Sequence, residues 1–281
     1  MLVYKLQLFA PVRVGQRWGY AFVDTGAGHS RLLTPYAAPY ERLEPRQSRG
    51  ALGAMRLERC SVPSVTFLDR AYRDLVVDIQ SDFSVDPPPK REVSVCAGQD
   101  VLTREPLHLD FEARELGFRA RDTLPKAPAQ TLPFRRTGKV YAFEMQLGGA
   151  ALPTLFDTGA GISLLNARYL EDVNDLETLD SVDTTDTSGT VQSLPVYRHP
   201  RPEVAGVPWG GFRFLVADLS AVERAANATI GMIYGFEALS RYNWLIKPVQ
   251  LAYKLERRGT PQAGVRNSLG HLTTPLVKLA P

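Results

Sequence analysis

The sequence predicts an all-β protein made of two similar domains, and three observations lead to this prediction. Short alternating or β-branched segments recur along the chain of 281 residues, and Gly, Pro and Asp separate them at short intervals. The pentapeptide Asp-Thr-Gly-Ala-Gly occurs twice, beginning at Asp24 and at Asp157. A second pair of matching segments follows the two copies at similar distances. Such self-similarity indicates a tandem duplication of a β-rich unit.

The two copies align at two separate places. The stretch GYAFVDTGAGHSRLL (19–33) matches LPTLFDTGAGISLL (152–165), which places the two aspartates 133 positions apart. Further along, CAGQDVLTREPLHLDF aligns without gaps with IYGFEALSRYNWLIKP, so that Gly98 matches Gly235. The Asp-to-Gly separation is 74 residues in the first copy and 78 in the second. Two anchors in one order and at one spacing are hard to obtain by chance.

The strands expected in each copy are its short β-rich segments. In the first copy they are residues 3–9, 19–23, 64–68, 75–79, 93–96 and 116–118. In the second copy they are residues 140–147, 154–156, 191–196, 212–217, 229–233 and 251–255. Helical patterns are few, and we expect helices at residues 166–179 and directly after Gly98 and Gly235.

The duplication and a proline-rich stretch between the copies predict the domain boundaries. The expected units are an N-terminal domain (1–120), a linker (121–138), a C-terminal domain (139–256) and a tail (257–281). The linker, RDTLPKAPAQTLPFRRTG, has little periodicity, as is usual for a connecting segment. We expect strands near residues 130–134 and 272–279 to connect the halves, which would make the tail an interdomain strand.

Composition and charge narrow the class of protein. Hydrophobic residues at 44% and charged residues at 22% are ordinary for a globular protein, and the chain is long enough to bury a sizeable core. The net charge of +3, from 33 basic and 30 acidic residues, is too balanced to indicate nucleic acid or a membrane as partner. The N-terminus does not resemble a secretion signal, and no apolar run approaches the roughly 18–20 residues of a membrane span. We therefore expect a cytoplasmic protein.

The two cysteines and four histidines do not form a metal-binding pattern. Cys60 and Cys96 are too few for a disulfide framework and too far apart for zinc-type spacing. We expect both to be reduced and buried, and a disulfide between them remains the alternative. The histidines stand alone in the sequence, so we expect no metal and no cofactor; they are His29, His108, His199 and His271.

Both copies of the motif resemble the retropepsin-like aspartic proteases, in particular their bacterial branch. In that family apolar residues precede Asp-Thr-Gly-Ala, and a second motif similar to Ile-Leu-Gly-Met-Asp-Phe-Leu follows, with a hairpin after it. Here the second motif reads CAGQDVL in the first copy and IYGFEAL in the second, and LHLDFEARELGF matches the hairpin. The resemblance covers most of both halves and leaves out the linker and the tail.

The resemblance implies two acid-protease (retropepsin-like) β-barrel domains related by a pseudo-two-fold axis, with the active site in the cleft between them. Peptide hydrolysis without a metal requires one group that takes a proton from water and another that gives one to the carbonyl oxygen. Two carboxyl groups about 3 Å apart do both, because they share one proton. Asp24 and Asp157 are the expected catalytic pair of an aspartic endopeptidase, a hydrolase of protein or peptide substrates. We expect a monomer, because one chain holds both copies.

The resemblance also assigns supporting roles to the residues that follow each aspartate. Thr25 and Thr158 would bond across to the opposite loop and lock the catalytic pair. Gly26 and Gly159 would let the backbone approach closely enough for an N–H group to point at a carboxylate.

Two further pairs of residues have expected roles. Gly98 and Gly235 would lie where a strand passes under the active loop and leaves no space for a side chain. Ala27 and Ala160 stand where pepsin-like enzymes carry a Ser or Thr that donates a hydrogen bond to the carboxylate. Because alanine cannot donate, we expect a pH optimum in the mildly acidic to neutral range.

A hairpin that covers the substrate is expected between the two motifs of each half. The segments are SRGALGAMRL, with Gly50 and Gly53 near its tip, and DTSGTVQSL, with Gly189 near its tip. An extended substrate would gain main-chain hydrogen bonds there as an added strand. One functional flap and two functional flaps are equally compatible with the sequence.

Other interpretations of the motif are weaker or remain open. A turn aspartate often caps its own backbone, but two matched copies favour catalysis. The Gly-x-Gly of each copy lacks the third glycine and the βαβ pattern of a dinucleotide site. A catalytically silent pseudoprotease that acts as a peptide-binding or regulatory module remains open, because Phe236 and Glu237 depart from the Met-Asp of the family. An obligate homodimer with sites between chains also remains open.

Overall fold

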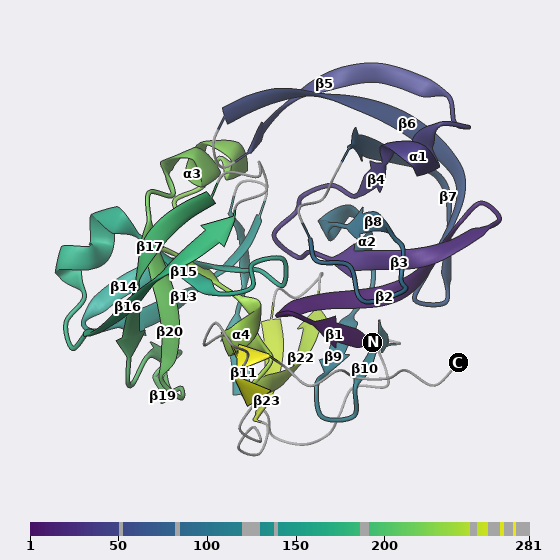
Figure 1. Cartoon of the computed structure of the whole chain (residues 1–281). Helices are drawn as coiled ribbons and strands as arrows, with labels where there is room; N and C mark the ends of the chain where they lie inside the picture. Colours follow the sequence, from purple (N-terminus) through teal and green to yellow (C-terminus); the bar gives the residue numbers. More distant parts are fainter. Residues whose placement is uncertain are drawn as a thin grey trace.

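Figure 1 shows the computed structural model of the chain. It describes residues 1–50, 53–81, 85–119, 130–137, 140–185, 191–247, 252–257, 265–266 and 272–273. The described residues are mostly β-structure, as predicted, and they form one large sheet in each half and a third sheet that both halves share.

The N-terminal half is built on an eight-stranded sheet. Its strand order is β1-β2-β3-β8-β4-β7-β6-β5, and an additional pairing of β2 with β6 curls the sheet onto itself. Short helices α1 (Thr34–Ala37) and α2 (Gln99–Leu102) follow β4 and β8. The strands are β1 (Leu2–Tyr4), β2 (Gln7–Val14), β3 (Arg17–Val23), β4 (Arg31–Leu33), β5 (Arg42–Gly50), β6 (Gly53–Phe67), β7 (Arg70–Gln80) and β8 (Val93–Ala97).

The C-terminal half is built on a ten-stranded sheet among the described residues. Its strand order is β16-β17-β20-β15-β21-β14-β13-β18-β19, and β12 also pairs with β13. The elements are β12 (Arg135–Thr137), β13 (Val140–Leu147), β14 (Ala150–Phe156), β15 (Ser163–Asn166), the 3-10 helix η1 (Ala167–Asp172), β16 (Glu177–Thr185), β17 (Val191–His199), β18 (Glu203–Val204), β19 (Val207–Pro208), β20 (Phe212–Ala217), α3 (Ser220–Ala226), β21 (Met232–Tyr234) and α4 (Phe236–Leu239).

The two halves repeat one topology around the duplicated motifs. In the N-terminal half, β3 pairs in parallel with β8, and β4 pairs in parallel with β7 and antiparallel with β8. In the C-terminal half, β14, β21, β15 and β20 make the same three pairings. The strand before each motif, β3 or β14, ends immediately before its aspartate, Asp24 or Asp157. The sequence repeat is therefore also a structural repeat.

A third sheet joins the two halves. Its strand order is β10-β9-β22-β23-β11, so two strands of the N-terminal half lie beside two strands of the C-terminal half, and β11 from the connecting segment lies at the edge. The direct junction is the antiparallel pairing of β9 with β22, in which Leu109 lies opposite Trp244. The strands are β9 (Leu107–Asp110), β10 (Glu115–Phe118), β11 (Gln130–Pro133), β22 (Tyr242–Lys247) and β23 (Ala252–Arg257).

The sequence predicts that strands near residues 130–134 and 272–279 link the halves. β11 falls within residues 130–134 and lies in the shared sheet, as expected. In the tail, β25 (Leu272–Thr273) pairs with β24 (Val265–Arg266) in a separate two-stranded sheet. Residues 274–279 lie outside the described residues.

One hydrophobic core includes residues of both halves and of the shared sheet. Trp244 of β22 is 1% exposed, and its indole N–H donates to the carbonyl of Leu239 at 2.8 Å. Its ring packs edge-on against Phe156, with ring centroids 4.9 Å apart. Phe156 directly precedes Asp157, so the junction of the halves supports the base of the motif loop. Burial of such large aromatic side chains is a dominant stabilising contribution in protein cores.

The helix predicted at residues 166–179 is wrong. The structure has the short 3-10 helix η1 and then strand β16 from Glu177. Asn174 ends the helical turn, because its backbone N–H and its side-chain amide both donate to the carbonyl of Gly148. Asp175 then takes a left-handed conformation, with φ of 58°. These turn contacts override the helical pattern of the acidic stretch.

Other local predictions have mixed outcomes. Short helices follow Gly98 and Gly235 as expected, whereas α3 was not predicted and the strand expected at residues 229–233 begins only at Met232. Cys60 and Cys96 are both free and buried, as expected, so no disulfide joins them.

Replacing Phe134 with alanine should destabilise the protein by about 3–5 kcal/mol, because it leaves a cavity in the core. Phe134 lies between β11 and β12, is 3% exposed, and packs on Phe143 and Phe156 at ring-centroid distances of 4.9 and 5.8 Å. Urea unfolding measures the change. The matched control is Trp18→Ala, since Trp18 is 66% exposed. Equal unfolding free energies for the two variants would contradict this account of the junction.

Candidate active site

The first motif loop holds its aspartate with backbone N–H groups. Asp24 follows β3 and is half-buried. The N–H groups of Gly26 and Ala27 both donate to its Oδ1 atom at 2.9 Å. Two donors on one oxygen fix the carboxyl group and leave Oδ2 free of these loop contacts.

The second motif loop repeats this arrangement. Asp157 follows β14 and is also half-buried. The N–H groups of Gly159 and Ala160 donate to its Oδ1 atom at 2.7 and 3.2 Å. The two loops therefore present their carboxyl groups in the same local geometry.

The two carboxyl groups face each other at the junction of the halves. A Cβ atom placed on Gly26 would overlap the carboxylate of Asp157, and one placed on Gly159 would overlap the carboxylate of Asp24. Each glycine thus lies against the aspartate of the opposite copy, where any side chain would separate the pair. The structure brings together the two aspartates that the sequence singled out.

The pair of carboxyl groups favours retention of a proton. Burial, and then the negative charge of Asp24, raise the pKa of Asp157, and the N–H groups of Gly159 and Ala160 offset only part of this effect. A hydrogen bond that the protonated carboxyl group of Asp157 donates to Asp24 also contributes to the raised pKa. Two carboxyl groups in contact cannot both be ionised at low cost, so the pair holds one proton over an extended pH range.

Two threonines lock the loops to one another. The N–H of Thr25 donates to Oγ1 of Thr158 at 3.1 Å, and the N–H of Thr158 donates to Oγ1 of Thr25 at 3.0 Å. Each hydroxyl in turn donates to a carbonyl of the opposite copy, that of Phe156 at 3.0 Å from Thr25 and that of Val23 at 2.8 Å from Thr158. Both side chains are buried, so these reciprocal bonds are shielded from water.

The glycines of the second motif pass directly beneath the active loops. A Cβ atom on Gly98 or on Gly235 would approach loop backbone to 2.6 Å. Each glycine N–H donates to a fully buried serine hydroxyl at 3.0 Å, that of Ser30 or that of Ser163. Sequence reasoning gave these serines no role, although both stand six positions after their aspartate.

The two copies differ at the acidic residue of the second motif. In the first copy, Asp100 accepts hydrogen bonds from the N–H of Ser30 at 2.9 Å and from its hydroxyl at 2.7 Å. In the second copy, Glu237 instead accepts two bonds from the guanidinium of Arg213, at 3.1 and 2.8 Å. The longer side chain at Glu237 therefore reaches a different partner from that of Asp100.

Each half has a long hairpin where the sequence predicts a flap. In the N-terminal half, β5 and β6 pair as far as Gly50 and Gly53. In the C-terminal half, β16 and β17 form the hairpin, and Gly189 lies outside the described residues. Strand β5 contacts helix α3 of the C-terminal half, so the first hairpin crosses from one half to the other (Figure 1).

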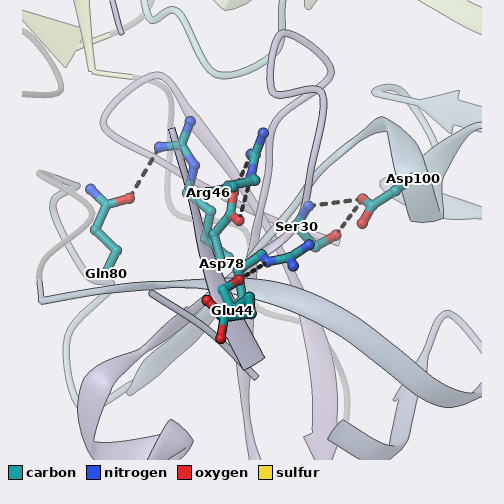
Figure 2. A network of polar contacts seen from close by, with 8 residues as sticks. Ser30, Glu44, Arg46, Asp78, Gln80 and Asp100 are labelled. Carbon is teal, nitrogen blue, oxygen red and sulfur yellow. Dashed lines mark hydrogen bonds and ion pairs between the residues drawn. The ribbon is translucent and has the colours of Figure 1, made fainter. Parts of the chain in front are cut away.

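A polar network connects the base of the first hairpin to the first active loop (Figure 2). Arg46 of β5 makes two bonds to the buried carboxylate of Asp78 on β7, one of them from Nε to Oδ1 at 2.7 Å. The N–H of Asp78 donates to the carbonyl of Ser30 at 3.1 Å, and Ser30 is bound to Asp100. The hairpin, β7 and the loop that carries Asp24 are therefore linked by partly buried polar contacts.

Neither a metal site nor a membrane-spanning helix is found in the described part of the chain. There, no group of three or more His, Cys, Asp or Glu side chains is arranged to hold a metal ion. Within the same residues, no helix is long and apolar enough to cross a membrane.

The two sheet domains and the sheet they share define the fold of a pepsin-like aspartic proteinase. The chain is similar in structure to the aspartic proteinase from Irpex lacteus, with a TM-score of 0.53 and 13% sequence identity. The match covers 90% of this chain and 94% of that chain. No protein-family model matches the sequence, and no curated protein matches it. At this identity the likeness establishes the fold alone.

Replacing Thr158 with valine should lower the free energy of unfolding by about 2–5 kcal/mol, because it leaves the N–H of Thr25 and the carbonyl of Val23 buried without their partner. Thr158→Ser is the matched control, since it keeps the hydroxyl and loses only a methyl group. Urea unfolding of both variants measures the difference. A serine variant as unstable as the valine variant would show that packing, not hydrogen bonding, is what Thr158 supplies.

The raised pKa of Asp157 predicts a pH-dependent cost to stability. The folded protein keeps a proton that the unfolded chain releases near pH 4, so the stability that this group contributes is lost as the pH rises from about 4 through the raised pKa. Asp157→Asn cannot ionise and should lose this dependence, so it gains stability relative to the wild type as pH increases. Urea unfolding between pH 4 and 8 tests this. The exposed Asp180→Asn is the control, and parallel curves for wild type and Asp157→Asn would refute the prediction.

Proposed function

We propose that the chain is an aspartic endopeptidase of the retropepsin-like type, with both halves of the active site in one polypeptide. The observation that carries this proposal is the pair Asp24 and Asp157, two half-buried carboxyl groups from duplicated loops that face each other. The raised pKa of Asp157 supports it, because an acid–base mechanism needs one protonated and one ionised member. The proposed substrate is a protein or peptide, without a metal or cofactor.

The chemistry follows from a water molecule held between the two carboxyl groups. The ionised carboxylate takes a proton from the water as its oxygen attacks the carbonyl carbon, and the protonated carboxyl group gives its proton to the carbonyl oxygen. The resulting gem-diol collapses when the C–N bond breaks. The leaving nitrogen receives the proton held by the first carboxyl group, and a diol hydroxyl returns a proton to the second. Each carboxyl group then has its starting protonation state.

The hairpin formed by β5 and β6 is our proposed flap. It crosses from the N-terminal half to helix α3 of the C-terminal half, and its base is fixed by the ion pair of Arg46 with Asp78. A substrate in an extended conformation beneath it would gain main-chain hydrogen bonds on both sides. We propose that the chain works as a monomer, because both aspartates come from one polypeptide and their carboxyl groups already share a hydrogen bond.

The proposal predicts that the protein cuts peptides and that either Asp24→Asn or Asp157→Asn lowers the rate by about 10²–10⁴-fold. Each variant keeps the shape of the site and removes one carboxyl group from the proton-sharing pair. A diverse peptide mixture, incubated from pH 3 to 8 and read by mass spectrometry, reports cuts, specificity and pH optimum together. We expect an optimum in the mildly acidic to neutral range, since the raised pKa of Asp157 keeps the acid protonated there.

The outcomes of this experiment separate the alternatives. No cuts by the folded wild type would favour a peptide-binding module over an enzyme. Cuts that persist in both variants would exclude the pair as the catalytic group. An optimum near pH 2–3 would leave the enzyme class intact and overturn the expectation drawn from Ala27 and Ala160.

A further inference from the structure

The two copies differ at one position directly beside the aspartates. Strand β8 carries Cys96 where strand β21 carries Ile233. The registers are equivalent, because Cys96 lies opposite Phe22 on β3 and Ile233 lies opposite Leu155 on β14. The same place in the repeated fold is therefore occupied by a thiol in one half and by a hydrocarbon in the other.

The thiol of Cys96 is directed at the first aspartate. Its Sγ atom lies 3.7 Å from Oδ2 of Asp24, within the range of a hydrogen bond from sulfur. Oδ1 of Asp24 already accepts hydrogen bonds from the loop N–H groups of Gly26 and Ala27. The thiol donates to the other oxygen, Oδ2. No bond of this kind is possible from the side chain of Ile233, which is a hydrocarbon.

The surroundings keep the thiol protonated and able to donate. Cys96 is 2% exposed. Burial, and then the negative charge of Asp24, raise the pKa of Cys96 well above its ordinary value. The S–H group is a weak donor, but a bond to an ionised acceptor in a buried site is stronger than one to a neutral acceptor. The other potential position for a donor, Ala27 in the loop itself, has no polar side-chain atom.

We propose that Cys96 is a positioning residue that stabilises Asp24 in its ionised form and thereby makes Asp24 the general base and Asp157 the general acid. This inference rests on the proposed function, and it breaks the symmetry of two otherwise matched loops. Asp24 takes the proton from water, and Asp157 gives its proton to the carbonyl oxygen. The S–H bond of Cys96 stays intact throughout, so the thiol takes no part as a nucleophile.

The first test is the pH dependence of kcat/KM in Cys96→Val, Cys96→Ser and Cys60→Val. Loss of the donor in Cys96→Val should move the acidic limb of the profile to higher pH by roughly half a unit, because the ionised base is less stabilised. Serine keeps a donor, so Cys96→Ser should keep the limb at the wild-type pH or move it lower. Cys60 is the other buried free cysteine of the same half, and Cys60→Val should leave the limb unchanged. A limb in Cys96→Val that coincides with the wild type overturns the proposal, and so does an equal shift in Cys96→Ser.

A second measurement does not depend on activity. In Cys60→Val, Cys96 is the only thiol of the chain, and its S–H stretching band in the Raman spectrum reports its hydrogen bond. The band should shift when Asp24→Asn is added, because an amide is a weaker acceptor than a carboxylate. A band that does not respond overturns the proposed contact. A wild type that cuts no peptide overturns the proposed function, while this band still decides whether the thiol donates to Asp24. If Cys96→Val does not fold, the profile of Cys96→Ser and the band decide together.

Discussion

Two carboxyl groups in contact in a half-buried site repel each other once both are ionised, and the surrounding structure must hold them together against that repulsion. The loops do so through contacts that cross between the copies. Thr25 and Thr158 exchange hydrogen bonds, and each hydroxyl continues to a carbonyl beneath the opposite loop. Gly26 and Gly159 remove the side chains that would keep the loops apart. Both halves therefore contribute the contacts that fix the positions of the two carboxyl groups.

The duplication makes the two motif loops symmetric. The residues around these loops have diverged, so the surroundings of the two loops differ. Asp100 binds the serine of its own loop, whereas Glu237 binds an arginine of a neighbouring strand. The hairpin of β5 and β6 reaches across to α3. Cys96 has no polar counterpart in the second half. Once both copies reside in one chain, each position is free to change independently, which a homodimer of identical chains does not permit.

The sequence reveals features that repeat and misses features that depend on distant contacts. The aspartates, threonines and glycines of both motifs were predictable, because the repeat exposes them and their chemistry is specific. The helix expected at residues 166–179 fails because Asn174 bonds to Gly148, a contact that no local pattern contains. The ion pair of Arg46 with Asp78 and the bond of Cys96 to Asp24 join residues 32 and 72 positions apart, respectively. Such pairings become visible only when the sheet register is known.

The sheet shared by the halves also constrains the order in which the molecule is completed. Leu109 of β9 pairs with Trp244 of β22, residues that leave the ribosome far apart in time. Until the later strand is made, the edge of β9 that will receive it has exposed backbone donors and acceptors, which is a hazard for association with other chains. Pairings of such long sequence separation also slow folding. The second half thus acts as the partner that shields the nascent first half, a task that a separate subunit performs in a dimer.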